Sequence, residues 1–450
     1  MTAEKHFHPL AALHLLRKTV LVYLVPLVQV LLERNWQALQ AALRQELVLF
    51  LLLGGLCWAV CYASRWQVDA EGTVHVCWRL GIRLDRFLRA DALAALVIDQ
   101  PLLYRLTGAC KVVLYPAGQI RTITLYITRH EAEQLADLLF PVENPLWHAP
   151  KGGEKLAFTV LGANSLSTLA LWWLAIHQSQ NYVPDAQTTA FAQLSRLAAF
   201  AARWLPVGTA WLLVFTGTLF CGSLARSALQ AAHYTVWRTD TQLGSRGGLL
   251  RRYEMRVCLA QLNYADVRRS PATWALHYCP VYVTAGACKP ELPLFVWKEG
   301  SPLLQELLPG IVLPPDAPAD TTGRSLVFFL PAGIPFALCL LLTAVSRTTL
   351  PALTLPLLIP TGVFAALLAA SAVGWRKEGV WAQNGRLTLC RQHGFHLHCL
   401  CVFHPDAGFS VLQSPWAVTA QRANLTLVFP GKEKCKVRSV PLTDLAFLER

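Results

Sequence analysis

The chain has 450 residues, of which 54% are hydrophobic and only 15% are charged. Soluble domains carry about 25% charged residues, so this composition excludes an ordinary soluble globular protein and indicates segments that lie in lipid. The formal net charge is +13, but no RNA- or DNA-binding signature accompanies it, which argues against a nucleic-acid partner.

The chain repeats one layout three times: two apolar stretches, then a basic segment rich in predicted strands. The apolar stretches lie at residues 19–32 and 47–62, at 156–176 and 204–222, and at 325–343 and 350–373. A helix needs about 20 apolar residues to cross the hydrocarbon core of a bilayer. Because internal repetition decides the fold class first, we predict an α+β membrane protein. It has six transmembrane helices in three hairpins, each followed by a small β-barrel-like domain with a C-terminal helix.

Each round of this layout forms one predicted domain, and the three domains cover residues 1–150, 151–318 and 319–450. In the first domain, apolar and polar side chains alternate on both sides of Glu71-Gly72, which predicts a hairpin. Thr128 and Glu131 have the spacing of a capping box, so a helix is predicted from there to Leu139.

The later rounds keep the same order of strands. A proline ends the central strand-rich stretch each time, at Pro101, Pro271 and Pro415, and a further strand is predicted ten to eleven residues later. In the third round, Asn384-Gly385 is a strong signal for a tight hairpin turn.

The basic residues predict the orientation of the chain in the membrane. The N-terminus and the three large segments hold 35 of the 40 Lys and Arg residues, and the three hairpin loops hold 5. Cytoplasmic segments of membrane proteins carry this excess of positive charge. We therefore expect a multi-pass protein of the bacterial inner membrane, with both termini and all three domains in the cytoplasm.

Basic residues beside the predicted helix ends are candidates for contact with lipid headgroups of the anionic inner leaflet. Each such residue near the surface contributes about 1 kcal/mol of attraction. The alternative is a solvated cytosolic face that follows the positive-inside rule alone. The candidates are Arg17, Lys18, Arg65, Arg226, Arg376 and Lys377.

One cluster suggests a metal: Cys390, His393, His396, His398, Cys399, Cys401 and His404. On a strand, His396 and His398 share one face, whereas the last two cysteines share the other. Four ligands therefore do not converge on a tetrahedral site. We expect no metal and no cofactor, with the histidines on the polar face of a strand and the cysteines in the core.

Catalytic motifs are lacking, since the chain has no GxSxG, HExxH or Walker sequence. Charged residues are nearly absent from the predicted helix interiors, which disfavours a pump or a proton pathway. A non-enzymatic binding or scaffolding protein is the primary expectation. A lipid-handling or efflux-type transporter is the alternative, and a membrane enzyme without a recognised motif is a third hypothesis.

Two segments resemble a known family. The opening "FHPL" (Phe7 to Leu10) and the run "RADALAALVIDQPLLYRLTGACKVVLYPAG" (Arg89 to Gly118) resemble the bacterial pleckstrin-homology-like membrane proteins of the YdbT type. The later rounds match more loosely, through "DVRRSP" (Asp266 to Pro271) and "VLQSP" (Val411 to Pro415).

The resemblance implies that each soluble domain is pleckstrin-homology-like, with seven strands in a bent, barrel-like sheet capped by one helix. It also implies a smaller single-domain membrane subunit as a partner, and a role in envelope-stress defence or antimicrobial resistance. The sequence thus predicts an inner-membrane protein that presents three cytoplasmic domains for protein or lipid binding.

Overall fold

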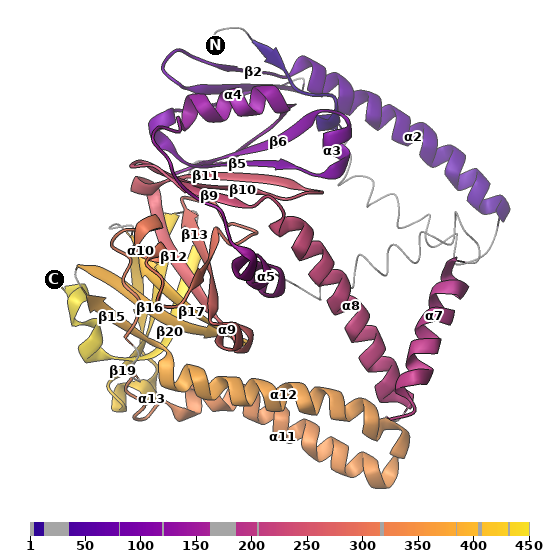
Figure 1. The fold of residues 1–450 in the computed structure, drawn as a ribbon, viewed down its shortest axis with the longest axis vertical. Coiled ribbons are helices and arrows are strands. Elements are labelled where there is room, and N and C mark those ends of the chain that lie inside the picture. The colour runs from indigo at the N-terminus through magenta and orange to yellow at the C-terminus, as the bar shows by residue number, and fades with distance from the viewer. Residues whose placement is uncertain are drawn as a thin grey trace. The chain divides into compact units, whose positions relative to one another are not determined.

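The computed structural model describes residues 4–12, 36–80, 82–118, 121–162, 186–204, 207–315, 319–383, 385–403, 407–430 and 433–449. These residues form helices and four sheets (Figure 1). The chain divides into two compact units. Unit 1 comprises Met1–Trp147, Trp237–Gln261 and Ala285–Cys288, and unit 2 comprises the remainder.

The first round begins with a helix and a four-stranded sheet, whose strands lie in the order β1-β2-β3-β4. The predicted hairpin is confirmed, because β2 and β3 pair across a turn in which Gly72 has a φ of 76°. The elements are β1 (Lys5–His6), α2 (Trp36–Ala63), β2 (Arg65–Val68), β3 (Val74–Leu80) and β4 (Ile82–Leu88).

The second half of the round packs on this sheet through buried apolar side chains, among them Trp66, Leu96 and Leu135. The predicted capping box is confirmed: the Thr128 hydroxyl accepts from the amide of Glu131, whose carboxylate accepts from the Thr128 amide at 3.1 Å. The elements are η1 (Ala90–Ala92), β5 (Leu93–Gln100), α3 (Leu102–Leu106), β6 (Ala109–Pro116), β7 (Ile123–Thr128) and α4 (Arg129–Leu139).

Strands of the second round continue the sheet of the first. β11 lies antiparallel beside β5, with Arg256 opposite Leu96, and the sheet has the order β7-β6-β5-β11-β10-β9-β8. The added elements of the second round are β9 (Thr235–Arg238), β10 (Gln242–Gly247), β11 (Arg252–Cys258) and η2 (Leu259–Gln261), and β8 (Leu146–His148), from the end of the first round, completes the sheet.

The rest of the second round and the whole third round form most of unit 2. The second round contributes α5 (Gly152–Leu161), α7 (Ala186–Ala201), α8 (Val207–Ala231), β12 (Leu262–Arg269), α9 (Pro271–Leu276), β13 (Tyr278–Ala285), β14 (Phe295–Lys298) and α10 (Leu303–Leu307). The third contributes α11 (Ser325–Thr349), α12 (Pro351–Lys377), β15 (Gly379–Gln383), β16 (Arg386–His393), β17 (His396–Val402), β18 (Gly408–Leu412), α13 (Pro415–Thr419), β19 (Arg422–Phe429), β20 (Glu433–Pro441) and η4 (Leu442–Glu449).

A second joint between rounds occurs in unit 2, where β12 pairs with β17 and Ala265 lies opposite Cys401. The resulting sheet has the order β14-β13-β12-β17-β16-β15, and β18-β19-β20 form a separate sheet. A buried cluster that includes Leu389, Leu400 and Leu425 holds the two sheets of the third round together.

The prediction of six transmembrane helices in three hairpins is wrong. Within the described residues, two helical segments are long and apolar enough to cross a membrane, Ser325–Thr349 and Leu357–Lys377. The apolar part of α2 is Leu51–Ala63, which falls short of the roughly 20 residues that a span needs. The predicted stretch at 19–32 lies outside the described residues, as does most of 156–176.

The prediction that each hairpin is followed by its own barrel-like domain is also wrong, because two of the four sheets are shared between rounds. Alternation of apolar and polar residues identifies a strand and its buried face. It does not identify the neighbouring strand, because the main chain of β5 or β12 could form hydrogen bonds with any strand whose apolar side chains lie on the same side of the sheet. The division at residues 150 and 318 stays a prediction.

Arg324 ties the start of α11 to the end of α12. Its buried guanidinium donates to the carbonyls of Trp375 at 2.7 Å, Glu378 at 2.8 Å and Gly374 at 3.1 Å. The last carbonyls of a helix have no partner within the helix and attract cations. Burial lowers the pKa of Arg324 to about 10, so the side chain remains charged at neutral pH. Glu378 in turn forms an ion pair with Arg438 of β20 at 3.0 Å.

We expect Arg324→Gln to lower the free energy of unfolding by about 2–3 kcal/mol, because it leaves buried carbonyls without their charged donor. Denaturant unfolding in detergent micelles, followed by tryptophan fluorescence, measures this change. Arg347→Gln is the matched control, because Arg347 is exposed in the last turn of α11, and it should shift the value by less than about 0.5 kcal/mol. Equal effects of the two variants would contradict the role assigned to Arg324.

Candidate functional site

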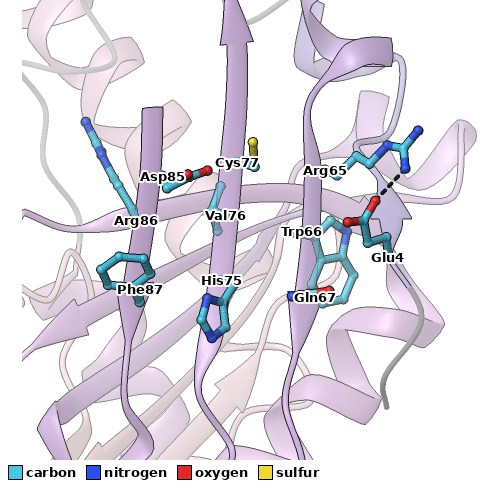
Figure 2. Close-up of a pocket in the computed structure, with 10 residues that line it drawn as sticks. All are labelled: Glu4, Arg65, Trp66, Gln67, His75, Val76, Cys77, Asp85, Arg86 and Phe87. Atoms are coloured by element: carbon cyan, nitrogen blue, oxygen red, sulfur yellow. Dashed lines mark hydrogen bonds and ion pairs between the residues drawn. The ribbon is translucent and has the colours of Figure 1, made fainter. Parts of the chain in front are cut away.

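A hollow of about 130 Å³ lies on the sheet formed by β1–β4. Figure 2 shows that three neighbouring strands, β2, β3 and β4, supply most of its walls. The lining residues are Glu4, Arg65, Trp66, Gln67, His75, Val76, Cys77, Asp85, Arg86 and Phe87.

The register of the strands decides which side chains share a face of this sheet. Arg65, Cys77 and Asp85 lie opposite one another across the three strands, and Gln67, His75 and Phe87 form a second such row. Directly opposed residues of antiparallel strands project on the same side. Trp66 and Val76, which alternate with them, are buried in the core. Both rows therefore lie on the outer face.

The outer face mixes charge with one aromatic ring. Arg65 forms an ion pair with Glu4, and the His75 imidazole lies 2.7 Å from the carboxylate of Asp69. The His75 ring meets the Phe87 ring edge-on at 5.5 Å. Small-molecule pockets usually enclose about 300–1,000 Å³. A shallow hollow of this size suits a segment of protein laid across the sheet better than an enclosed ligand.

The hollow opens onto the edge of the sheet. β4 is the last strand in the order β1-β2-β3-β4, and among the described residues no strand pairs with its outer side. Such an edge presents unpaired N–H and C=O groups to any incoming strand. Leu84 and Phe87 of β4 are also 54% and 61% exposed. Main-chain groups and apolar side chains are thus both available at this edge.

The corresponding face of the second round is covered. Buried Arg256 of β11 donates to the carboxylate of Asp137 at 2.8 Å and to the carbonyl of Phe140 at 2.9 Å. The guanidinium of Arg246 lies over the ring of Trp147 at 5.2 Å. The end of α4 and the segment that follows it, residues 137–147, therefore lie against β10 and β11.

The corresponding face of the third round is covered in the same way. The amide of Val312, which follows α10, lies 3.4 Å from the Cys401 sulfur. Residues 313–315 also lie beside Cys390 and Cys399. In both cases the segment after the last helix of one round covers the next round's sheet. The first round's sheet has no such cover among the described residues.

The basic residues proposed from the sequence are scattered. Arg65 lines the hollow, whereas Arg376 and Lys377 lie in the last turn of α12 and Arg226 is exposed on α8. Arg17 and Lys18 lie outside the described residues. Contact of these residues with lipid headgroups stays a prediction.

Sequence reasoning missed the outer-face residues His75 and Phe87 and the open edge of β4. The alternation around Glu71-Gly72 carries the signal for which side chains point outward. The alternation carries no signal that a covering segment is absent, because the covering segment of a round comes from the preceding round.

On β17, His396 and His398 lie on one face and Cys399 and Cys401 on the other, as the alternation predicts, but His398 is buried and does not lie on a polar face. His398 Nδ1 lies 2.8 Å from the carboxylate of Asp266, whereas the Cys399 and Cys390 sulfurs lie 3.5 Å apart across the β16–β17 pair. Within the described chain, no group of three or more His, Cys, Asp or Glu residues could hold a metal ion. His404 lies outside the described residues.

Comparison with family models, with curated proteins and with solved structures finds no match to this chain. The resemblance of Phe7–Leu10 and Arg89–Gly118 to the YdbT type therefore stays a prediction.

Asp266 makes the β12–β17 joint sensitive to acid. Burial raises the pKa of its carboxyl group, but the hydrogen bonds and charges of His398 and Arg268 outweigh burial and hold the pKa below its ordinary value of 3.8. A carboxyl group with a depressed pKa stabilises the folded state above its unfolded pKa. That contribution is lost as the pH falls below about 3.8 through the lower pKa of the folded state.

We expect Asp266→Asn to lower the free energy of unfolding by about 3 kcal/mol at pH 7, because it breaks a buried ion pair. The difference from the wild type should be present at pH 7 and shrink as the pH falls below about 3.8. Denaturant titrations across this range test it, with exposed Asp240→Asn as the control. A difference that did not change with pH would sink this account of Asp266.

Proposed function

We propose that this protein is a non-enzymatic membrane scaffold, anchored by the α11–α12 hairpin, that binds protein through the first round's open sheet. One observation carries the proposal. The outer faces of β10–β11 and β16–β17 are covered by protein segments, whereas no described residue covers the equivalent, hollowed face of β3–β4. The equivalent faces of the other two rounds bind segments of this chain, so the face of the first round is suited to a protein partner.

The hairpin supports the membrane anchor. Only 11% of each candidate span is buried, and α11 exposes apolar side chains along its length, including Leu326, Leu330, Ile334, Leu338 and Leu341. Soluble monomers rarely expose apolar patches of this extent. A helix of 25 residues is about 37 Å long at 1.5 Å per residue, which is enough to cross the core. Figure 1 shows α11 and α12 side by side.

Basic residues support an orientation for this hairpin. Arg324, Arg376 and Lys377 lie at its open end, whereas Arg347 is the basic residue in the last turn of α11 at the closed end. The positive-inside rule places the open end, and with it the third round, on the cytoplasmic side of a bacterial inner membrane. Arg376 and Lys377 then lie where anionic headgroups attract them.

The mode of binding follows from the edge of β4. An incoming strand that pairs with an exposed sheet edge gains main-chain hydrogen bonds, and side-chain contacts give it specificity. The hollow beside β4 offers cationic Arg65, the His75 imidazole and the Phe87 ring for those contacts. Scaffolding of this kind requires no catalytic group.

Cysteine labelling tests the anchor. In a Cys221→Ser background, which removes an exposed native thiol, Thr349→Cys at the closed end of the hairpin should react with an impermeant maleimide added to spheroplasts. Phe395→Cys, in the exposed β16–β17 turn, should react only after lysis. Labelling of Phe395→Cys in intact spheroplasts would overturn the proposed orientation.

Photo-crosslinking tests the binding face. A photoreactive residue at Gln67, which lines the hollow, should yield a protein adduct in native membranes, because the proposal places a protein on this face. The same residue at Leu106, exposed on α3, is the control and should leave mostly uncrosslinked chain. Adducts with lipid alone at Gln67 would refute protein binding by this face.

A further inference from the structure

We propose that copies of this chain assemble head to tail, with β18 of one copy pairing with β4 of the next. The inference rests on the proposed function, since it names the protein that the open face binds. The chain itself shows the joint twice, and the two strands that would form it a third time lie at sheet edges in the described part of the chain.

The internal joints follow one rule. We call β5, β12 and β18 the donor strands, because each precedes a short helix that a proline introduces, at Pro101, Pro271 or Pro415. We call the third long strand of each round, β4, β11 and β17, the acceptor strand. The donor of the first round pairs with the acceptor of the second, and the donor of the second with the acceptor of the third. Both pairings are antiparallel.

Three donors and three acceptors make only two joints, which leaves the acceptor β4 and the donor β18. Each is the last strand of its sheet among the described residues. The two donor strands that form joints differ in burial from the one that does not. Nearly every residue of β5 and β12 is buried, whereas all five residues of β18 are exposed. Phe409 and Leu412 are 52% and 66% exposed.

The exposure of Phe409 is informative because of where it lies. Phe409 and Val411 lie opposite Leu427 and Leu425 of β19, which belong to the buried core of the third round. These two side chains thus share the core face of their sheet and still lie open. In the first round, the core-facing donor residues Leu96 and Ile98 are buried beside β11. β18 lacks the neighbour that β5 has.

The internal joints also fix the register of the proposed one. For two opposed residues, we count the positions from each residue to the proline of its own round, Pro101, Pro271 or Pro415, and add the two counts. The sum is 20 in both joints. Leu96 opposite Arg256 and Ala265 opposite Cys401 are examples. The same count places Phe409 of one copy opposite Phe87 of the next.

This register matches exposed apolar side chains to one another. Besides the two phenylalanines, it sets Leu412 opposite Leu84, and all four side chains are at least half exposed in the single chain. Aromatic and other well-matched cross-strand pairs contribute about 0.2–1 kcal/mol each, and burial of their apolar area adds to this. A strand shifted by one residue would lose both matches.

The hollow fits the same arrangement. Arg256, which lies on the outer face of β11 as Phe87 lies on the outer face of β4, touches Asp137 of α4, the helix that closes the preceding round. The element in the place of α4 in the third round is η4, which follows β20. Docking of β18 on β4 would therefore bring η4 of one copy against the hollow of the next. Such an interface joins unlike surfaces, so it builds a closed ring or an open row.

Cysteine cross-linking between differently tagged copies tests the register. One copy carries Arg86→Cys and the other Ser410→Cys, because the proposed register sets these positions opposite each other. Opposed residues have Cα atoms about 4.5–5.5 Å apart, within reach of a disulfide. We expect mild oxidation of membranes from co-expressing cells to give a product that contains both tags.

Arg86→Cys with Leu412→Cys is the matched control, because two residues of slip move the sulfurs by about 7 Å. It should cross-link at least about five-fold less than the in-register pair, and the copies without added cysteines should give only background. Equal yields for the two pairs, or no product containing both tags, would overturn the proposal.

A second measurement follows the assembly without cysteines. The full chain in lipid nanodiscs or mild detergent should be oligomeric by mass, and Phe409→Lys should weaken association at least about ten-fold, because lysine at a strand edge blocks pairing. Phe395→Lys replaces a phenylalanine that is 45% exposed and lies away from the edge, and this variant should assemble as the wild type does.

A monomeric wild type at all concentrations would refute self-assembly. The photo-crosslink at Gln67 keeps this failure distinct from failure of the proposed function. If Gln67 couples to a different protein, such as a smaller single-domain subunit, protein binding by the face stands and assembly with a second copy is wrong.

Discussion

The edges of β-strands are the constraint on which the rest of this structure depends. A strand at the end of a sheet leaves main-chain donors and acceptors without partners, and proteins must cover, pair or blunt that edge. Here the chain pairs its edges across rounds, β5 with β11 and β12 with β17. The segments after α4 and α10 then lie over the sheets that have been added. The composition of the two shared sheets therefore depends on the order of the rounds and not on any single round.

The same constraint explains why the two ends of the array differ from its middle. A joint uses a donor strand from one round and an acceptor strand from the next, so a linear array always leaves one of each. β4 and β18 occupy these places, and their exposed apolar side chains are the direct consequence. Residues 137–147 cover the outer face of β10–β11, and residues 311–315 cover the outer face of β16–β17. The hollow lies on the equivalent face of β1–β4, which no described residue covers.

The membrane hairpin is joined to this array by buried charge. Arg324 reaches the last carbonyls of α12, and Glu378 at the end of that helix pairs with Arg438 of β20. Buried charges are costly unless they are paired and hydrogen-bonded, so this arrangement requires the two helix ends and β20 to keep their positions. A rigid base of this kind would hold the third round at a defined place relative to the bilayer.

The sequence by itself determined the local elements. Alternation gave β2 and β3 around Glu71-Gly72, the Thr128 capping box gave α4, and the uncharged stretches after Arg324 gave the apolar hairpin, because each of these signals depends on neighbours along the chain. Of the residues that line the hollow, the sequence singled out Arg65, as a candidate for contact with lipid headgroups. Tertiary structure alone decided that β5 pairs with β11, that Arg256 meets Asp137, and that the face bearing His75 and Phe87 has no cover within the described part of the chain. Pairing and cover join residues far apart in the sequence, 119 positions for Arg256 and Asp137, and the period of a strand specifies its faces but not its neighbours.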